Sequence, residues 1–289
     1  MSELWRNRVL MFIVMLIAAM GWFFSKQGIR YFEPFEFMAI RFSIGTAFLL
    51  GFAWQRRWLW GDIVAGLRVG SVFFVSMVFW ILALERSTMQ GIGLGGFIIT
   101  LGVVVSPIIG FWLFSEPFGR GYWWALALAV LGGVLMAPGF QVHSLYLFIA
   151  AATLLGLYMT LMTRASRHND PVVISIVGFV LLVAGMTVLS AVFEQHQPVG
   201  SWHGWGWVVL SGAVATALRF LLQARVQGRL VQSEASLIMN LEGVAVVLIA
   251  VTFTGVSYHW IQWAGAALVV AAVLVMVGRQ SVSRAARTL

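Results

Sequence analysis

The sequence predicts an all-α, polytopic membrane protein with ten transmembrane helices. Ten apolar stretches follow one another along the chain, and their connections leave no length for a soluble domain. Of the 289 residues, 61% are hydrophobic and only 10% are charged. A helix needs roughly 20 mainly apolar residues to cross a hydrocarbon core about 30 Å thick, and the stretches approach that length. Because backbone groups in lipid must be hydrogen-bonded internally, we expect each span to be a helix.

Several predicted spans have features of their own. The first follows Arg6 and Arg8 and so resembles a signal peptide, but it has spanning length and lacks a clear cleavage site. We therefore expect it to stay in the mature chain. The fourth span carries small residues at helical spacing from Gly91 to Gly110, a pattern that lets helices pack closely in lipid. In chain order, the predicted spans are Val9–Gln27, Phe35–Trp54, Leu67–Leu84, Ile92–Phe114, Trp123–Pro138, Leu145–Thr163, Val172–Phe193, Trp205–Gln223, Ser236–Thr254 and Trp260–Gly278.

The basic residues indicate the orientation of these spans. With the N-terminus in the cytoplasm, 13 of the 18 Lys and Arg residues fall on the inner side and 3 on the outer side, while Arg41 and Arg219 lie within spans. Inner connections of membrane proteins carry such an excess of Lys and Arg. We therefore expect a multi-pass protein of the inner (plasma) membrane with both termini in the cytoplasm. The net charge of +8 then reflects orientation, and no nucleic-acid partner is expected.

The chain divides into two halves near Pro138–Ser144, giving predicted domains 1–139 and 140–289. Each half holds five spans, and because five is odd, the second half enters the membrane from the opposite side. Inverted repeats of this kind are common in secondary transporters, which bind substrate near the repeat interface. The fifth and tenth spans, both rich in Ala and Gly, support an internal repeat.

Four stretches carry a resemblance to a known family. They are Ala18–Lys26 with Trp22, Pro34–Phe42 with Arg41, Ala83–Leu84 leading through a glycine-rich span to Glu116–Pro117, and Asn240–Gly243, which Gln262–Gly265 follows. In this order they resemble the drug/metabolite transporter superfamily, specifically its ten-helix EamA-type branch. The chain departs from the family pattern at Gly243, where proline is usual, and at Val256, where a glutamate is expected. A role for that glutamate therefore does not transfer.

The resemblance implies a secondary active transporter, not an enzyme, that moves a small organic metabolite through the lipid bilayer. An amino acid or a related compound is the expected substrate, export is the expected direction, and alternating access between the two repeats is the leading mechanism. Two alternatives remain open. One is a broad-specificity exporter of hydrophobic or cationic toxic compounds. The other is a lipid-linked carrier scramblase or membrane assembly factor, which a lateral groove open to lipid would favour.

Arg219 is the leading candidate for a site residue because it lies well inside the eighth span. A charge at this depth costs about 2.5–3.5 kcal/mol on insertion scales, so it should face the bundle interior. Thr216 and Gln223 share its helix face by spacing. Glu242 falls at a similar depth in the ninth span, beside Asn240, and is the expected partner of Arg219. The pair either lines the substrate path or forms a static interhelical bridge; Arg219 alone can also snorkel to the inner headgroups.

Other candidates have a structural alternative in each case. Arg41 is either a clamp or a substrate contact, and Lys26 either gates the outer entrance or snorkels to the outer interface. Aromatic residues on spans that should border a central cavity suit an amphipathic or aromatic substrate, although ordinary packing is the alternative. These residues are Trp22, Phe79, Trp80 and Tyr158.

No motif predicts a cofactor, a metal or an enzymatic reaction. The chain has no cysteine, no His-x-x-x-His pair and no glycine-rich loop ending in Gly-Lys-Ser/Thr. Asp62 and Asp170 are expected to cap helices. Transport must then be driven by a gradient, and Glu242 is the candidate carrier of a coupled proton.

Overall fold

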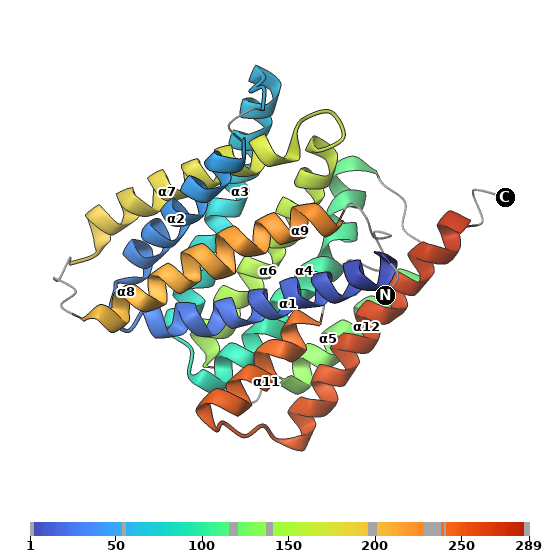
Figure 1. Cartoon of the computed structure of the whole chain (residues 1–289). Helices are drawn as coiled ribbons and strands as arrows, with labels where there is room; N and C mark the ends of the chain where they lie inside the picture. The colour runs from blue at the N-terminus through green and yellow to red at the C-terminus, as the bar shows by residue number, and fades with distance from the viewer. Residues whose placement is uncertain are drawn as a thin grey trace.

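The computed structural model describes residues 3–53, 56–115, 121–136, 141–195, 201–227, 238–239 and 241–285, and these residues form an all-helical bundle without strands (Figure 1). The predicted all-α membrane fold is confirmed. The helices are α1 (Glu3–Gly28), α2 (Pro34–Ala53), α3 (Trp60–Glu85), α4 (Met89–Phe114), α5 (Gly121–Met136), α6 (Val142–Ala165), α7 (Pro171–Phe193), α8 (Trp202–Val209), η1 (Leu210–Leu218), α9 (Arg219–Gln227), α11 (Glu242–Thr254) and α12 (Trp260–Ala285).

Every predicted span overlaps one of these helices. Within the described ranges, 6 helices are long and apolar enough to cross a membrane: α1, α2, α3, α6, α7 and the continuous α8–η1–α9. Shorter apolar helices of 10–17 residues lie in α4, α5, α11 and α12. The count of ten crossings therefore stays a prediction.

The eighth span differs from the regular helix that its hydropathy predicts. Between α8 and α9 the chain forms the π-helix η1, in which backbone hydrogen bonds reach back five residues. The Thr216 hydroxyl follows the same spacing and donates to the carbonyl of Ser211 over 3.0 Å. π-helical turns inside α-helices are frequent at functional sites, and this one ends directly before Arg219.

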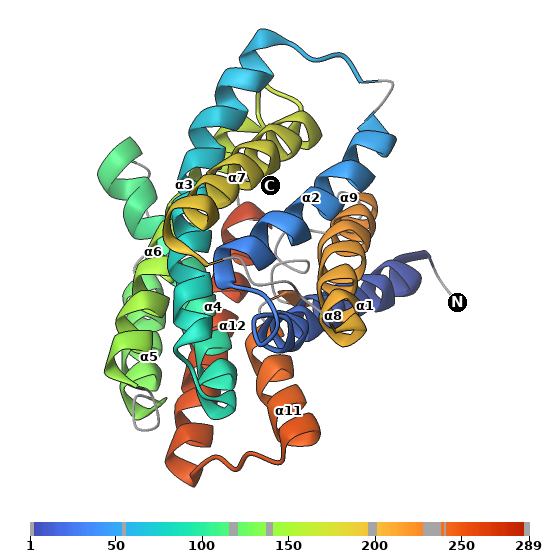
Figure 2. The ribbon, with the colours of Figure 1, turned by 90° about the vertical axis from the view of Figure 1, so that its left-hand side faces the viewer.

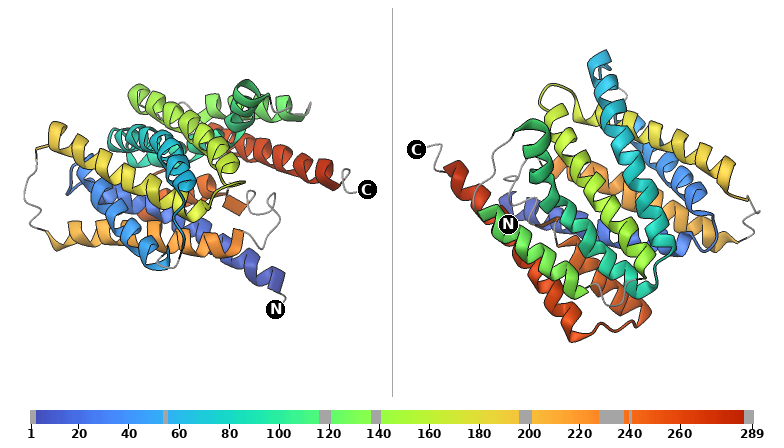
Figure 3. Two further views of the ribbon diagram at one scale, coloured as in Figure 1. Left: turned by 90° about the horizontal axis from the view of Figure 1, so that it is seen from above. Right: turned by 180° about the vertical axis from the view of Figure 1, so that it is seen from behind.

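The helices pack into two groups, shown side by side in Figure 2. We call α3, α4, α6 and α7 the α3 group, and α1, α2, α8–η1–α9 and α11 the α1 group. The groups meet along α2–α7 and along α4–α11, while α5 packs against α12. The start of α1 and the end of α12 lie toward the same side of the bundle (Figure 3).

Small residues allow the close packing of these helices. In α4, a Cβ added to Gly102 would lie 2.6 Å from the carbonyl oxygen of Ala152 in α6, and Ser106 and Thr160 share a hydrogen bond of 2.7 Å between the same helices. The small-residue face predicted for the fourth span therefore packs against α6. Because the hydrophobic effect does not drive helix association in lipid, such close packing and hydrogen bonds hold the helices together.

Candidate functional site

Glu242 contacts two other helices of the α1 group in the bundle interior. Its Oε1 accepts a hydrogen bond of 3.0 Å from the indole Nε1 of Trp22 on α1. Its Oε2 lies 3.6 Å from Nη2 of Arg219, the first residue of α9. Glu242 is also the first residue of α11, where the helix dipole favours a negative charge.

A second polar cluster surrounds Arg41 on α2. The Arg41 Nε donates to the hydroxyl of Thr216 in η1 over 2.9 Å, and Nη1 donates to the hydroxyl of Ser25 on α1 over 2.7 Å. Ser211 of η1 completes the cluster, with its hydroxyl 3.5 Å from that of Ser25. Arg41 is 8% exposed and Thr216 is 1% exposed, so these bonds hold a buried cation between three helices.

Glycines let η1 approach this cluster. A Cβ on Gly45 of α2 would lie 2.7 Å from the Thr216 Cγ2, and a Cβ on Gly212 would lie 2.9 Å from the Arg41 carbonyl oxygen. Neither position tolerates a side chain without movement of its neighbour. The glycines therefore bring the Thr216 hydroxyl within hydrogen-bond distance of Arg41.

Aromatic rings of the α3 group face these polar residues. Trp80 of α3 meets the Trp22 ring edge-on at a centroid distance of 5.2 Å, and Phe148 of α6 lies 6.0 Å from the same ring. Phe73, Tyr158 and Phe179 continue the aromatic surface, with Phe73 and Tyr158 at 4.7 Å and Phe73 and Phe179 at 6.1 Å. The charged groups of the site thus come from the α1 group, and most of the rings come from the α3 group.

The charges at this site are close enough to influence one another. Arg41 lies within electrostatic range of both Arg219 and Glu242, and Tyr158 within range of Arg219. The side chains of Arg219 and Glu242 keep 24% and 21% of their surface exposed. Since a charge facing hydrocarbon is costly, this exposure favours a water-accessible position inside the bundle.

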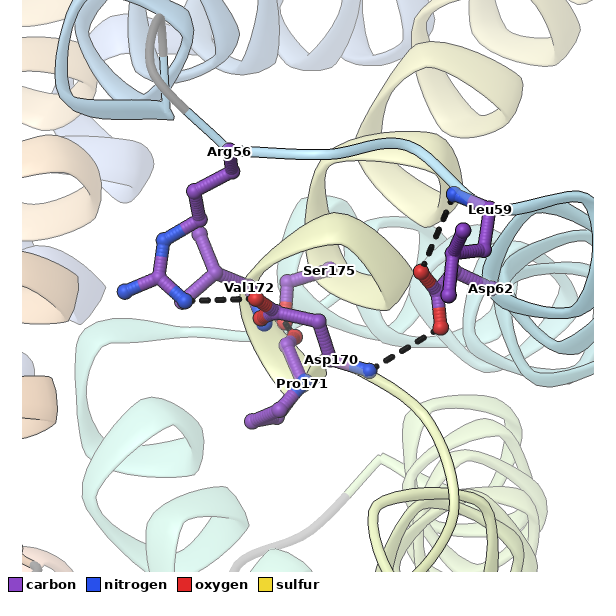
Figure 4. Close-up of polar contacts among 7 residues, drawn as sticks. All are labelled: Arg56, Leu59, Asp62, Asp170, Pro171, Val172 and Ser175. Carbon is purple, nitrogen blue, oxygen red and sulfur yellow. Dashed lines mark hydrogen bonds and ion pairs between the residues drawn. The ribbon is translucent and has the colours of Figure 1, made fainter.

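Polar contacts also join the two helix groups at their ends. Figure 4 shows Arg56, just after α2, paired with Asp170, which caps α7 by accepting from the Val172 N–H, and Asp62 accepting from the Asp170 N–H at 3.0 Å. Partial burial raises the pKa of Asp170, but the Arg56 hydrogen bond, the backbone N–H groups and the Arg56 charge together lower it below its ordinary value. Asp62 also accepts from the Leu59 N–H at 3.3 Å, so both aspartates cap helices as expected.

At the opposite end, Lys26 of α1 donates to the carbonyl oxygens of Leu84 and Glu85 at 2.7 and 3.0 Å. These carbonyls end α3, where a cation is favoured. The Glu194 carboxylate accepts from the backbone N–H groups of Phe35 and Glu36 at 2.6 and 2.9 Å, which joins the end of α7 to the start of α2. The two groups are therefore connected at both ends.

The model of the EamA-like transporter family matches this chain twice, over residues 7–137 and 143–278. The chain belongs to the EamA-like transporter family. An uncharacterized transporter from Archaeoglobus fulgidus is 25% identical over 250 residues, covering 84% of this chain and 77% of that protein. A solved structure titled only "Crystal structure of protein" is similar with a TM-score of 0.65 and 18% identity, over 93% of this chain and 95% of that one, and shows the fold alone.

Family membership makes this EamA-like protein a multi-pass membrane transporter for a small molecule, not an enzyme. The structure brings several predicted residues together. The expected contact between Arg219 and Glu242 is present, Trp22 bonds to Glu242, and Arg41 bonds to Thr216 and lies 5.8 Å from the centre of the Trp80 ring.

The structure also locates the other predicted residues. Phe79 of α3 is partly buried and packs against the buried apolar core of the bundle. Tyr158 contacts Phe73, and so continues the aromatic surface described above. Gln223 is half-buried on α9. Asn240 lies outside the described residues.

The sequence did not predict several residues of this candidate site. Ser25 follows Trp22 by one helical turn, so a helical wheel of the first span would have placed it on the same face. Ser211 and Phe148 carry no local signal, because hydroxyls and rings at such spacing are common in membrane helices. The π-helix η1 leaves no mark in hydropathy.

Proposed function

We propose that the protein is a secondary active transporter that exports a small organic metabolite, an amino acid or a related compound, across the inner membrane by alternating access. The observation that carries this proposal is the partly exposed Arg219–Glu242 pair on one helix group, facing the aromatic surface of the other group. A substrate between the groups contacts both, so their relative movement can expose it to either side.

The proposal includes two inverted repeats, 1–139 and 140–289. The double match of the family model supports this division. So does the pairing of helices: α3 packs against α6 and α7, and the α8–η1–α9 helix correspondingly packs against α1 and α2. In the order of spans, α3 is the third and α8–η1–α9 the eighth, and α6 and α7 are five spans after α1 and α2. The two sets of contacts are therefore equivalent between the repeats, as a two-fold axis in the membrane plane requires.

Residue roles follow from the contacts. Arg41, with two side-chain hydrogen bonds and almost no exposure, is assigned a clamp that holds α1, α2 and η1 together. Lys26 is assigned the outer gate because it joins α1 to the last carbonyls of α3. Glu242 is proposed to carry the coupled proton. The distribution of basic residues in the sequence supports the proposal that both termini lie in the cytoplasm.

The same contacts argue against an exporter of cationic compounds. Such a site needs an uncompensated acid, whereas Glu242 already contacts Trp22 and Arg219. We therefore keep the metabolite transporter as the proposal.

The test is an untargeted metabolite comparison of cells that produce the wild-type protein, the Glu242→Gln variant or the matched control Glu33→Gln, whose side chain is exposed outside the helices. We expect a small set of metabolites to move outward with the wild type and the control but not with Glu242→Gln. The compounds found are then tested in liposomes containing purified protein. If no compound crosses those liposomes faster than it crosses empty ones, the proposal is wrong.

A further inference from the structure

We infer that the transported molecule is an organic monoanion, a carboxylate with an aromatic or similarly planar apolar body, and that its carboxylate binds the Nε–Nη2 edge of Arg219. This inference rests on the proposed function, since it names the substrate class of the same site. It narrows that proposal to related compounds that lack the ammonium group of an amino acid, because the proposed function holds equally for neutral or zwitterionic metabolites.

The net charge of the site favours an anion. Arg41, Arg219 and Glu242 lie within electrostatic range of one another and sum to a formal charge of +1. Arg41 already donates from Nε and Nη1 to the hydroxyls of Thr216 and Ser25. It therefore adds positive charge to the site, but these two nitrogens are not available to a ligand. A single negative charge on the substrate neutralises the site, whereas a cation is repelled by both guanidinium groups.

One edge of the Arg219 guanidinium group has N–H donors without an acceptor at hydrogen-bond distance among the described residues. Its Nε is buried, and no described residue accepts a hydrogen bond from it. Its Nη2 lies 3.6 Å from Glu242, beyond the roughly 3.2 Å limit of a good N–H···O bond. Nε and Nη2 point the same way and form the fork that binds a carboxylate through two parallel hydrogen bonds.

Glu242 does not occupy this edge of Arg219. The indole N–H of Trp22 holds its Oε1 at 3.0 Å, which orients the carboxylate but does not bring it into the Arg219 fork. A buried N–H group without an acceptor is unfavourable, so the fork is completed when a ligand supplies the acceptor to Nε. Because Nε is buried while 24% of the side chain is exposed, we expect the Arg219 side chain to rotate as the ligand binds.

Aromatic rings close to Arg219 indicate the body of the ligand. Phe220, next to Arg219 in the chain, meets Phe179 of the α3 group edge-on at 5.0 Å, and Phe179 adjoins Phe73. A carboxylate on Arg219 therefore places the rest of the molecule against rings. Aromatic rings favour flat apolar groups at centroid distances of about 4.5–7 Å.

Three ligands of one shape test the inference: 3-phenylpropanoate, 3-phenylpropanamide and 3-phenylpropylamine, which are anionic, neutral and cationic. Binding to the purified, detergent-solubilised protein is measured as the rise in unfolding temperature with ligand concentration. We expect the anion to bind about tenfold or more tightly than the amide, because a bidentate charged pair is lost. The amine should not bind. Preference for the amide or the amine, or binding of none of the three, overturns the inference.

Variants locate the site. Arg219→Gln should remove the preference for the anion, while the control Arg68→Gln, on an exposed position of α3, should keep it. Glu242→Gln tests the open fork even if Arg219→Gln fails to fold: it removes the negative charge next to Arg219, so anion binding should be retained or tightened. Loss of anion binding in a folded Glu242→Gln protein contradicts the assignment.

These results are separable from the proposed function. Transport is judged by flux of identified metabolites into or out of liposomes, whereas the inference is judged by ligand charge. A transporter whose confirmed substrate is neutral or zwitterionic keeps the proposed function and loses the inference.

Discussion

Neutralising Glu242 alone should destabilise the protein more than neutralising Glu242 and Arg219 together. The Glu242→Gln change leaves Arg219 inside the bundle without a counter-charge, and its Nε already lacks an acceptor among the described residues. Removing one member of a buried ion pair is strongly unfavourable, whereas replacing both members is often close to neutral. The double variant Arg219→Gln/Glu242→Gln should therefore recover much of the stability lost in the single variant.

The expected coupling follows from the geometry. Two unit charges 3.6 Å apart attract by about 4–5 kcal/mol at an effective dielectric constant of about 20. Desolvation offsets part of this attraction, and both side chains keep more than a fifth of their surface exposed. We therefore expect a coupling energy within the roughly 0.5–3 kcal/mol found for contacting residues, near the upper end.

The assay is a double-mutant cycle on the free energy of unfolding of the purified protein in detergent, repeated for transport rate in liposomes. A parallel cycle pairing Arg219→Gln with Glu33→Gln should be additive within about 0.3–0.5 kcal/mol, since Glu33 lies outside the helices. If the Arg219–Glu242 cycle is equally additive, the two residues are not coupled and the account of the site is wrong. If both variants transport at the wild-type rate, the pair lies outside the mechanism.

Three further predictions concern packing, pH and topology. Gly45→Ala should destabilise the protein by about 1–3 kcal/mol, because the new Cβ would lie 2.7 Å from the Thr216 Cγ2. The control Gly51→Ala, on the same helix, should not destabilise it, because nothing lies within 4 Å of the new Cβ. Equal losses of stability in the two variants would contradict the close packing of η1. The folded pKa of Asp170 is lowered, so its stabilisation is complete above the ordinary carboxyl pKa of about 3.9 and is lost as pH falls toward the folded value. The free energies of unfolding of wild type and Asp170→Asn should therefore differ by a few tenths up to about 1 kcal/mol above that pH, and the difference should disappear below it. If the difference does not change with pH, the Asp170 carboxylate does not make this contribution. A reporter active only outside the cytoplasm, fused to Leu289, should give no signal, and a strong signal would reverse the topology.

The sequence predicts the helices well because spanning a bilayer depends on composition and length. Hairpin geometry also predicts the contact between Arg219 and Glu242, since both lie at similar depth on consecutive spans. The partners of Arg41 could not be predicted, because Thr216 and Ser25 are far apart in the chain and their bonds depend on how three helices pack. The Arg56–Asp170 pair likewise joins connections 114 residues apart, and hydropathy carries no information on such pairs.

The π-helix η1 changes how the eighth span must be aligned with its relatives. A regular α-helix turns about 100° per residue, so one residue more or fewer rotates every later side chain by that angle. If Trp202–Gln227 is drawn on a helical wheel as a single α-helix, the side chains of α9 are therefore placed at wrong angles relative to those of α8. In a relative without the π-helix, an ungapped alignment pairs Arg219 with a residue on a different face. The residue equivalent in space is found only when one position within 210–218 is aligned to a gap.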